Sequence, residues 1–551
     1  MRAHADIDFG HIIVEVSPRE KDNMRGIPGS TYKNGYWQLP LTMAACWALR
    51  SVFGPDLSIG VGLSGWAAER TAKLNEVLAF RNGEKVYELP EHLYDFQRTG
   101  VSWMKIAGRA MLGDEQGLGK TIEALGAAAA FPALIIATNS MLYKWAAEAE
   151  QWLPGVSTSV VTGTAAQRRK AIEAGADITV IAWANLYRHG RLAGYGSVAL
   201  SERERTEGDL NHVGFHTIIA DEVHRAINPK TKQTRAWWYL SHNATYSYGL
   251  TGTLIANNAG DLWAPMHGIA PDEWPAKTKY IDRYTVSALN QHGGLEVFGF
   301  NPMTKDELFR ILTPRFLRRT KAEVLDQLPS IAPVQIREMP MEPKQAKGYE
   351  QMRKKMMTLT EEGDIIAATS PLVRDGRLEQ AAAATLALDE NDEVILTMPS
   401  VKVDTLMDLL DEVPGEPLVV FGKSKKLMYL CGKALEKAKI KFDYITGDQS
   451  DFERTESVGK FQAGELQVLL CTLGAGSEGI TLTRANRMLF LQRSWRHIDN
   501  MQAEARIHRI GQEREVQYII AKTLDAPIED RVLESNGDKK AMMDEVNEAG
   551  E

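Results

Sequence analysis

A glycine-rich stretch in the first quarter of the chain contains the residue types that bind phosphate groups. Residues 110–121 read AMLGDEQGLGKT, which predicts a strand, a loop and the start of a helix. Gly117 and Gly119 would let backbone N–H groups approach phosphate oxygens, because neither residue carries a Cβ atom. Lys120 would supply a cation for the β- and γ-phosphates, and the Thr121 hydroxyl would hold Mg²⁺.

This stretch departs from the strict phosphate-loop pattern at its first position, where Asp114 replaces glycine. The alternative interpretation is a glycine-rich start of a helix that binds no ligand. The lysine and threonine directly after the last glycine favour the phosphate loop. The helix that begins there would also point its positive end at the anion.

A pair of carboxylates at the end of an apolar run forms the second candidate group. Residues 216–224 read HTIIADEVH, and a buried carboxylate costs several kcal/mol unless it is paired or bound to a metal. Asp221 suits Mg²⁺ binding, and Glu222 suits polarisation of an attacking water. Together with a phosphate loop, the pair indicates hydrolysis of ATP. His224 taken alone is typical of a hydrogen-bonded surface histidine.

Two arginines near the end of the chain form the third candidate group. Arg506 and Arg509 lie three residues apart in QAEARIHRIGQ (502–512), a spacing that predicts one face of a helix. A salt-bridged helix face is the alternative. The preceding loop (472–482) is rich in glycine, which suits close approach of the backbone to a ligand or to DNA. We therefore expect these arginines to stabilise charge on the γ-phosphoryl group when two lobes close.

Short apolar runs that alternate with helix-like segments must position these groups. This alternation predicts an α/β fold with parallel sheets covered by helices, divided into two lobes. The runs are residues 133–137, 178–182, 216–220 and 246–250 in the first half, and 417–421, 442–445, 467–471 and 487–491 in the second.

The remaining regions lack the alternation of apolar runs and helix-like segments that marks the two lobes. Residues 340–398 predict helices with charged faces and a flexible link, and residues 190–212 predict a polar surface excursion. The first 88 residues predict a small α+β module with a strand at 11–16 and a helix from Leu41 to Phe53. The expected domains are the module at 1–88, a first lobe at 89–335, a helical insertion at 336–400 and a second lobe at 401–551.

Composition restricts the class of protein. The chain has 551 residues, a net charge of −8 and three cysteines far apart, without metal-ligand spacing. We therefore expect no zinc site, no disulfide framework and a reducing compartment. No apolar run is long enough for a membrane span, and the first residues lack a signal-peptide core. The net charge excludes a uniformly basic surface but permits a basic groove.

The order of these motifs resembles the Swi/Snf branch of helicase superfamily two, over about residues 90–535. LYDFQRTGVSWM (93–104) is similar to the first motif of that family, which implies an adenine contact for Gln97. The Asp at position 114 is the family's own version of the phosphate loop. LTGTLIANNAGDLW (250–263) resembles the coupling motif, and it keeps both threonines. The resemblance implies two RecA-like lobes.

The resemblance also implies a DNA interface. Residues 133–152 are similar to a motif that touches the DNA backbone, and residues 471–512 to later motifs with DNA contacts. RFLRRTKAEVLDQLP (315–329) matches a segment specific to this branch, which makes its basic residues a lobe-linking or DNA-facing element. The implied DNA-binding residues are Ser140, Trp145, Gly476, Thr481 and Trp495.

Residues 24–54 resemble the HARP-type module of annealing helicases, which helps to bind branched DNA. The alternative is that Trp37 forms the core of a small docking domain. The residues that carry this likeness are Ile27, Pro28, Tyr32, Trp37, Pro40 and Leu41.

The resemblance therefore implies a DNA-dependent ATPase that uses ATP and Mg²⁺ and moves along duplex DNA, with remodelling or reannealing of branched structures. DNA is the expected partner. The expected compartment is the cytoplasm of a bacterial or phage-infected cell, or the nucleus of a eukaryote. Three alternatives stay open: a strand-separating helicase, a non-enzymatic DNA-bridging scaffold, and the motor subunit of a nuclease complex.

Overall fold

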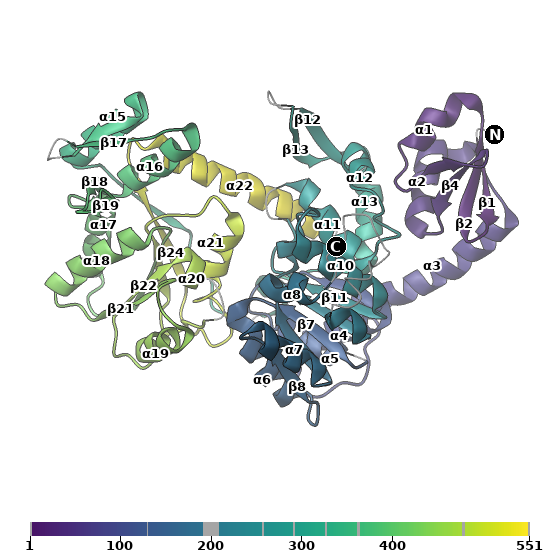
Figure 1. Cartoon of the computed structure of the whole chain (residues 1–551), viewed down its shortest axis with the longest axis horizontal. Helices are drawn as coiled ribbons and strands as arrows, with labels where there is room; N and C mark the ends of the chain where they lie inside the picture. Colours follow the sequence, from purple (N-terminus) through teal and green to yellow (C-terminus); the bar gives the residue numbers. More distant parts are fainter. Residues whose placement is uncertain are drawn as a thin grey trace. The chain divides into compact units, whose positions relative to one another are not determined.

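The computed structural model divides into two compact units, one built from residues up to Val324 with the end of the last helix, the other from Leu325–Lys540. Each unit contains one large parallel sheet with helices packed on it (Figure 1), so the predicted α/β fold with two lobes is confirmed. The structure describes residues 3–128, 130–190, 209–255, 258–289, 293–325, 328–360, 364–476 and 480–548.

The sheet of the first lobe has seven strands, all parallel. In sheet order they are β14 (Phe316–Leu317), β6 (Arg109–Leu112), β11 (Tyr246–Leu250), β10 (Thr217–Asp221), β7 (Ala133–Ala137), β9 (Ile178–Ala182) and β8 (Thr158–Val161). The inner strand β7 is buried at every residue, which explains why its sequence reads as a continuous apolar run. Three of the four strands predicted in this lobe have the expected bounds, and β10 is shifted by one residue.

Helices cover this sheet, and their apolar faces fill its core with tryptophan, leucine and alanine side chains. The helices of this lobe are α4 (Asp95–Ala107), α5 (Lys120–Ala127), α6 (Leu142–Trp152), α7 (Ala165–Glu173), α8 (Trp183–His189), α10 (Lys232–Asn243), α11 (Trp263–Ile269), α12 (Lys277–Tyr284), α13 (Lys305–Leu312) and α14 (Lys321–Val324). Short 3₁₀ turns include η3 (Asn139–Met141), η4 (Asp209–His212), η5 (Val223–Ala226), η6 (Ala259–Leu262) and η7 (Thr313–Arg315). An antiparallel pair, β12 (Thr285–Leu289) and β13 (Leu295–Phe300), lies between α12 and α13.

The N-terminal part of the same unit is a five-stranded sheet with three helices. The strands, in sheet order, are β3 (Thr31–Lys33), β4 (Tyr36–Pro40), β2 (His11–Val16), β1 (Ala3–Asp8) and β5 (Leu57–Ile59); the helices are α1 (Lys21–Arg25), α2 (Met43–Phe53) and α3 (Val61–Arg81), with 3₁₀ turns η1 (Pro18–Glu20) and η2 (Gly54–Asp56). The predicted strand at 11–16 is confirmed. The helix begins two residues later than predicted, because the Thr42 hydroxyl caps it by accepting a hydrogen bond from the Ala45 N–H at 3.2 Å.

This N-terminal part packs on the first lobe through named contacts. The Lys279 ammonium donates to the carbonyl oxygens of Ile27 and Ser30, at 3.3 and 2.7 Å. Arg81, the last residue of α3, donates from Nε to the Phe316 carbonyl oxygen at 3.1 Å. Trp37 is buried in the apolar core of its own sheet, which is the arrangement that the docking-domain alternative requires of this residue.

The sheet of the second unit has six parallel strands. In sheet order they are β15 (Gln335–Met339), β24 (Gln517–Thr523), β23 (Arg487–Phe490), β20 (Leu418–Gly422), β22 (Val468–Thr472) and β21 (Phe442–Ile445). Its helices are α17 (Val401–Glu412), α18 (Lys425–Lys437), α19 (Asp451–Gln462), α20 (Leu473–Gly476), α21 (His497–Glu504) and α22 (Pro527–Glu548). The four predicted strands are present, and β15 and β24 are additions to them.

The region at 340–398 is less helical than predicted. It contains two helices, α15 (Pro343–Lys355) and α16 (Pro371–Ala383), and two antiparallel strand pairs. The pairs are β16 (Met357–Leu359) with β17 (Ile365–Ala367), and β18 (Thr385–Leu388) with β19 (Val394–Thr397). The second pair forms because the Asp389 carboxylate accepts the N–H groups of Asn391 and Glu393, both at 2.9 Å, and thereby turns the chain.

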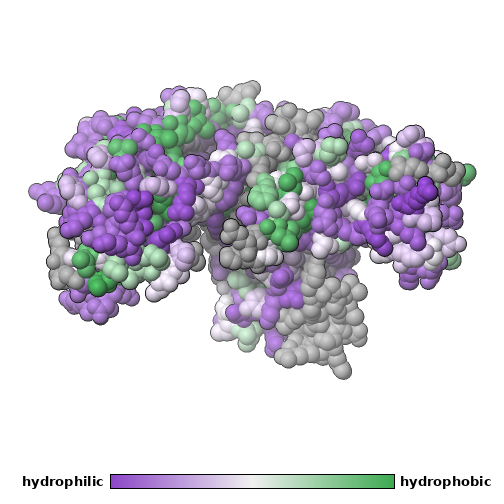
Figure 2. Space-filling view, turned by 90° about the horizontal axis from the view of Figure 1, so that it is seen from above, coloured by the Kyte–Doolittle hydropathy of each residue, from purple (hydrophilic) through white to green (hydrophobic). Residues whose placement is uncertain are grey.

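The surface is mainly polar on the face that Figure 2 shows, with apolar side chains in separate patches. Among the described residues, no helix has both the length and the apolar character needed to cross a membrane. Most of the surface excursion predicted at 190–212 lies outside the described residues, which resume with η4.

Candidate functional site

The predicted phosphate loop connects β6 to α5 at the carboxyl edge of the first sheet. Gly117 and Gly119 have φ angles of 95° and 87°, in the left-handed region that glycine adopts without steric cost. A Cβ atom at Gly119 would also lie 2.5 Å from Gln97 Nε2. The conformation of the loop therefore requires the two glycines that the sequence singled out.

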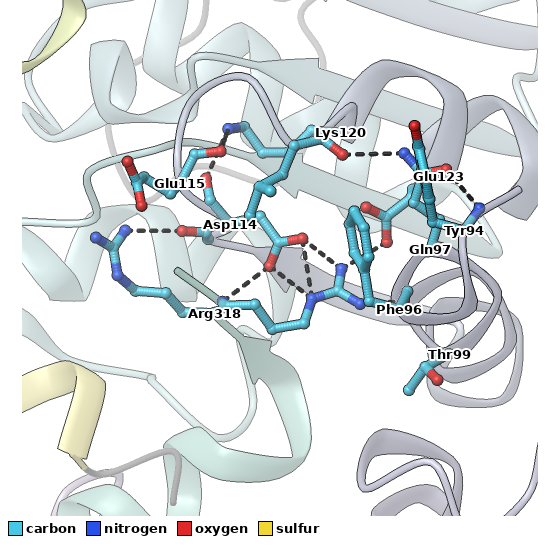
Figure 3. Close-up of polar contacts among 12 residues, drawn as sticks. Tyr94, Phe96, Gln97, Thr99, Asp114, Glu115, Lys120, Glu123 and Arg318 are labelled. Carbon is cyan, nitrogen blue, oxygen red and sulfur yellow. Dashed lines mark hydrogen bonds and ion pairs between the residues drawn. The ribbon is translucent and has the colours of Figure 1, made fainter. Parts of the chain in front are cut away.

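Lys120, the first residue of α5, folds back over this loop (Figure 3). Its ammonium donates to the carbonyl oxygens of Asp114 and Glu115, at 2.6 and 3.3 Å. Burial lowers the pKa of this ammonium, while the nearby carboxylates of Glu222, Asp114 and Asp221 act in the opposite direction. The predicted phosphate ligand thus lies beside the predicted acidic pair.

Gln97 supports the loop from α4. Its Nε2 donates to the Leu118 carbonyl oxygen at 3.0 Å, and its Oε1 accepts the Tyr94 N–H at 3.2 Å. The second bond is part of the cap that starts α4. The structure therefore links this side chain to the loop, and the predicted adenine contact stays a prediction.

The acidic pair follows directly from the central strand β10, whose last residue is Asp221. Two tryptophans hold this residue: Trp145 Nε1 donates to Asp221 Oδ2 at 2.9 Å, and Trp183 Nε1 donates to its carbonyl oxygen at 2.7 Å. Burial, followed by the neighbouring Glu222 carboxylate, raises the pKa of Asp221 to about 6. Glu222 has a φ of 50°, an uncommon conformation for a residue with a side chain and one that often marks a functional site.

His224 joins the acidic pair to the predicted coupling motif. Its Nδ1 lies 3.2 Å from Glu222 Oε2 and 3.2 Å from Thr251 Oγ1. Thr251 in turn donates to the Thr253 carbonyl oxygen at 2.8 Å. His224 is buried, so the interpretation as a surface histidine is wrong. Two features of the sequence could have indicated this buried position: His224 lies two residues after Glu222, and the coupling motif keeps both threonines.

The predicted DNA contact at Trp145 is wrong, because this side chain is fully buried. It lies on the apolar face of α6 with Leu142, Ala146 and Ala149, at the spacing of a core-facing helix stripe. Its function in the structure is to donate a hydrogen bond to Asp221. Ser140, by contrast, is exposed in η3, and its DNA contact stays a prediction.

Replacing Trp145 with phenylalanine is expected to lower the free energy of unfolding by about 1–3 kcal/mol, because a buried carboxylate oxygen loses its donor. The pKa of Asp221 should also rise further, since the indole N–H acts to lower it. Urea unfolding of the variant beside Trp152→Phe, at the end of the same helix, measures the effect. Equal losses in both variants would show that the hydrogen bond contributes nothing.

The basic segment predicted to link lobes or face DNA packs instead on the phosphate loop. Arg319 and Lys321 are buried, and Arg318 Nη1 donates to the carbonyl oxygens of Gly113 and Gly252, at 2.8 and 2.7 Å. The DNA-facing interpretation is therefore wrong for these side chains. The segment does lead out of the first unit, which reaches Val324.

The arginines of the second unit are not on a helix, because α21 ends at Glu504 and the chain continues in turns. The predicted shared helical face is therefore wrong. The two side chains nevertheless converge: Nη1 of Arg506 and Nη1 of Arg509 both donate to the Ile480 carbonyl oxygen, at 3.2 and 3.3 Å. A bond from the Leu482 N–H to the Arg506 carbonyl oxygen, at 2.9 Å, holds this turn.

The three other predicted DNA-binding residues have different surroundings. Gly476 is buried, and a Cβ atom there would lie 2.8 Å from Phe421, so packing explains the glycine and argues against a direct DNA contact. Thr481 is half-buried, and its DNA contact stays a prediction. Trp495 is also half-buried, and its indole N–H donates to the Glu379 carboxylate.

Two family models match this chain. The SNF2-related domain matches residues 96–385, more than half of the chain, and the helicase conserved C-terminal domain matches residues 401–511. A solved structure of the Sulfolobus solfataricus SWI2/SNF2 ATPase core in complex with dsDNA aligns with 24% identity over 85% of this chain and 95% of that one, with a TM-score of 0.39.

Curated relatives share the same region. The DNA annealing helicase and endonuclease ZRANB3 of Homo sapiens is 28% identical over 452 residues, which cover 79% of this chain and 39% of that protein. YwqA of Bacillus subtilis is 28% identical over 503 residues, which cover 83% of this chain and 50% of that protein. The chain thus spans half or less of these relatives. On the two domain matches, the chain belongs to the SNF2-related family of helicase-like ATPases.

Proposed function

We propose that the chain binds ATP with Mg²⁺ on its first lobe and uses hydrolysis to move along double-stranded DNA. Its family makes it a DNA-dependent ATPase of the helicase-like class. One observation carries the nucleotide assignment: the Lys120 ammonium lies on the glycine loop at the edge of one parallel sheet, where the carboxylates of Glu222, Asp114 and Asp221 act on its charge. Ligands of open parallel sheets bind at this edge.

The residues present fit a nucleotide with its metal. Thr121 and Asp221 offer the hydroxyl and carboxylate oxygens that Mg²⁺ prefers, beside phosphates and waters. The described ranges contain no cluster of three or more acidic, histidine or cysteine side chains that would form a protein-only metal site. Bound Mg²⁺ would neutralise charge on the phosphates.

Each remaining residue has a proposed task. Lys120 exchanges its two backbone acceptors for phosphate oxygens, and the glycine loop supplies N–H groups to the same anion. Glu222 orients and polarises the attacking water. Arg506 and Arg509 reach the γ-phosphoryl group from the second lobe when the lobes close, which makes hydrolysis depend on that motion.

DNA is the proposed partner, bound mainly through its phosphates and therefore sensitively to salt. Remodelling or reannealing of branched DNA is the proposed task, because the named relative ZRANB3 is an annealing helicase and residues 24–54 resemble a HARP-type module. The domains expected from the sequence are also proposed, with the first lobe ending at Val324 and the second lobe including β15. The proposed compartment is the bacterial or phage-infected cytoplasm, or a nucleus.

Replacing Lys120 with alanine is expected to abolish DNA-stimulated ATPase activity, because the cation for the β- and γ-phosphates is lost. The rate is measured with single-stranded, duplex and forked DNA. Lys170→Ala, an exposed change on α7 of the same lobe, is the control and should behave as wild type. Equal rates for Lys120→Ala and wild type would reject the nucleotide assignment. Unwinding of forks without annealing would favour a strand-separating helicase.

A further inference from the structure

The segment that leaves the first lobe runs alongside the phosphate loop. Strand β14 pairs in parallel with β6, so that Leu317 lies beside Leu112. The ladder then continues past both strands: the Gly113 N–H donates to the Leu317 carbonyl oxygen at 2.7 Å, and the Glu115 N–H to that of Arg319 at 2.9 Å. The backbone at the start of the loop is therefore held by a segment far along the chain: Arg319 follows Asp114 by 205 residues.

One guanidinium in this segment joins the two ends of the loop. Arg319 Nε lies 3.1 and 3.0 Å from the two oxygens of Asp114, at the loop's start. Its Nη2 also donates to Asp114, and to Glu123 Oε2 at 2.7 Å, in the first turn of α5. Its Nη1 donates to the Phe96 carbonyl oxygen. The Cζ atom of Arg319 lies over the Phe96 ring, 5.1 Å from the ring centroid. Figure 3 shows Asp114, Glu123 and Phe96 near one another.

The environment makes this connection strong. Both carboxyl side chains are fully buried, and Arg319 contacts both of them. Burial acts to lower the pKa of the guanidinium, but Asp114 and Glu123 outweigh it and the pKa is raised. Burial raises the pKa of the Glu123 carboxyl well above its usual range, although Arg319 opposes the shift. Nε and Nη2 of Arg319 both contact Asp114, whereas only Nη2 contacts Glu123, so Asp114 is the principal partner of Arg319.

A strict phosphate loop has glycine where this chain has Asp114, so it needs no such partner. Here the loop's first residue is fixed by a side chain rather than by a glycine turn. Arg318, one residue earlier, ties the same loop to the coupling motif through Gly113 and Gly252. Displacement of the segment would therefore move the loop that holds the nucleotide.

We propose that Arg319 is a positioning residue for ATP, which sets the spacing of the phosphate loop by joining Asp114 to Glu123. This inference rests on the proposed nucleotide function. It assigns the basic segment a task at the ATP site in place of a DNA contact. Because the segment ends where the first unit gives way to the second, it also connects the loop mechanically to the chain between the lobes.

Three variants separate this task from a purely structural one. Arg319→Met removes the guanidinium and leaves buried carboxylates uncompensated. The triple variant Asp114→Asn, Glu123→Gln, Arg319→Met also removes the carboxylate charges, and such replacements are often neutral for stability. Arg315→Met is the matched control: Arg315 lies in the same segment, pairs with Glu273 at 3.0 Å and donates to the carbonyl oxygens of Ala107 and Arg109, which precede the loop.

The measurements are the thermal midpoint, ATP affinity at equilibrium without DNA, and KM and kcat for ATP at saturating DNA. We expect Arg319→Met to lower the midpoint and to raise KM by roughly tenfold or more, because a displaced phosphate loop loses aligned contacts. The triple variant should recover most of the midpoint and keep the raised KM. Arg315→Met should lower the midpoint and leave KM unchanged.

Wild-type KM and ATP affinity in a folded triple variant would overturn the inference, because Arg319 would then serve stability alone. A raised KM in Arg315→Met equal to that of Arg319→Met would overturn it as well. Failure of the proposed function has a different signature: the wild-type protein itself would bind no ATP, and both proposals would fall together.

Discussion

Replacing Glu222 with glutamine is expected to reduce DNA-stimulated ATP hydrolysis by roughly 10²- to 10⁴-fold, the range that a positioned general base contributes. The amide keeps the size of the side chain but cannot polarise the attacking water. ATP affinity should stay close to wild type, because the proposed phosphate ligands, Lys120 and the glycine loop, are unchanged in this variant. Single-turnover hydrolysis and equilibrium nucleotide binding measure the two effects separately.

The surroundings of Glu222 make this expectation specific. Its left-handed backbone, with a φ of 50°, turns the chain directly after the central strand, and His224 Nδ1 lies 3.2 Å from its carboxylate. Glu173→Gln, an exposed change at the end of α7, is the control for loss of a carboxylate in the same lobe. Hydrolysis by Glu222→Gln at the control's rate would reject the assignment of the water-activating group.

Local patterns in the sequence were sufficient for the parts of the site that lie within one short segment. Gly119, Lys120 and Thr121 follow each other directly, and Asp221 and Glu222 end a run whose apolar character marks a buried strand. The parallel sheet then brings the two segments together, because consecutive βα connections place the carboxyl ends of its strands at one edge. The fold class, and the meeting of these two segments at one edge of the sheet, could thus be predicted jointly.

Contacts between distant segments could not be predicted in this way. Arg319 lies 205 residues from Asp114 in the chain. The sequence of the basic segment does not indicate that its side chains point toward the phosphate loop. Strand β14 has only two residues, so its pairing with β6 exists through tertiary contacts alone. Trp145 shows the same limit: its helical stripe indicates burial, but its bond to Asp221 depends on how α6 lies on the sheet.

Arg506→Ala and Arg509→Ala are each expected to lower kcat by roughly 10³- to 10⁵-fold, the range reported for arginines that stabilise the γ-phosphoryl transition state. The effects of the two substitutions should not be additive, because both guanidinium groups donate to the Ile480 carbonyl oxygen. Loss of one arginine therefore changes the position of the other. ATP affinity without DNA should be unchanged, since the phosphate ligands belong to the first lobe.

Arg496→Ala is the matched control, because Arg496 is an exposed arginine of the same unit. Its Nη1 lies 3.4 Å from Oδ1 of Asp499, in the first turn of α21. Lysine at position 506 or 509 should restore little, since an ammonium lacks the planar fork of donors that spans two phosphate oxygens. If the alanine variants hydrolyse ATP as the control does, the arginines only stabilise the turn after α21. Loss of hydrolysis with retained ATP affinity would instead show that the second lobe determines when the bound nucleotide is cleaved.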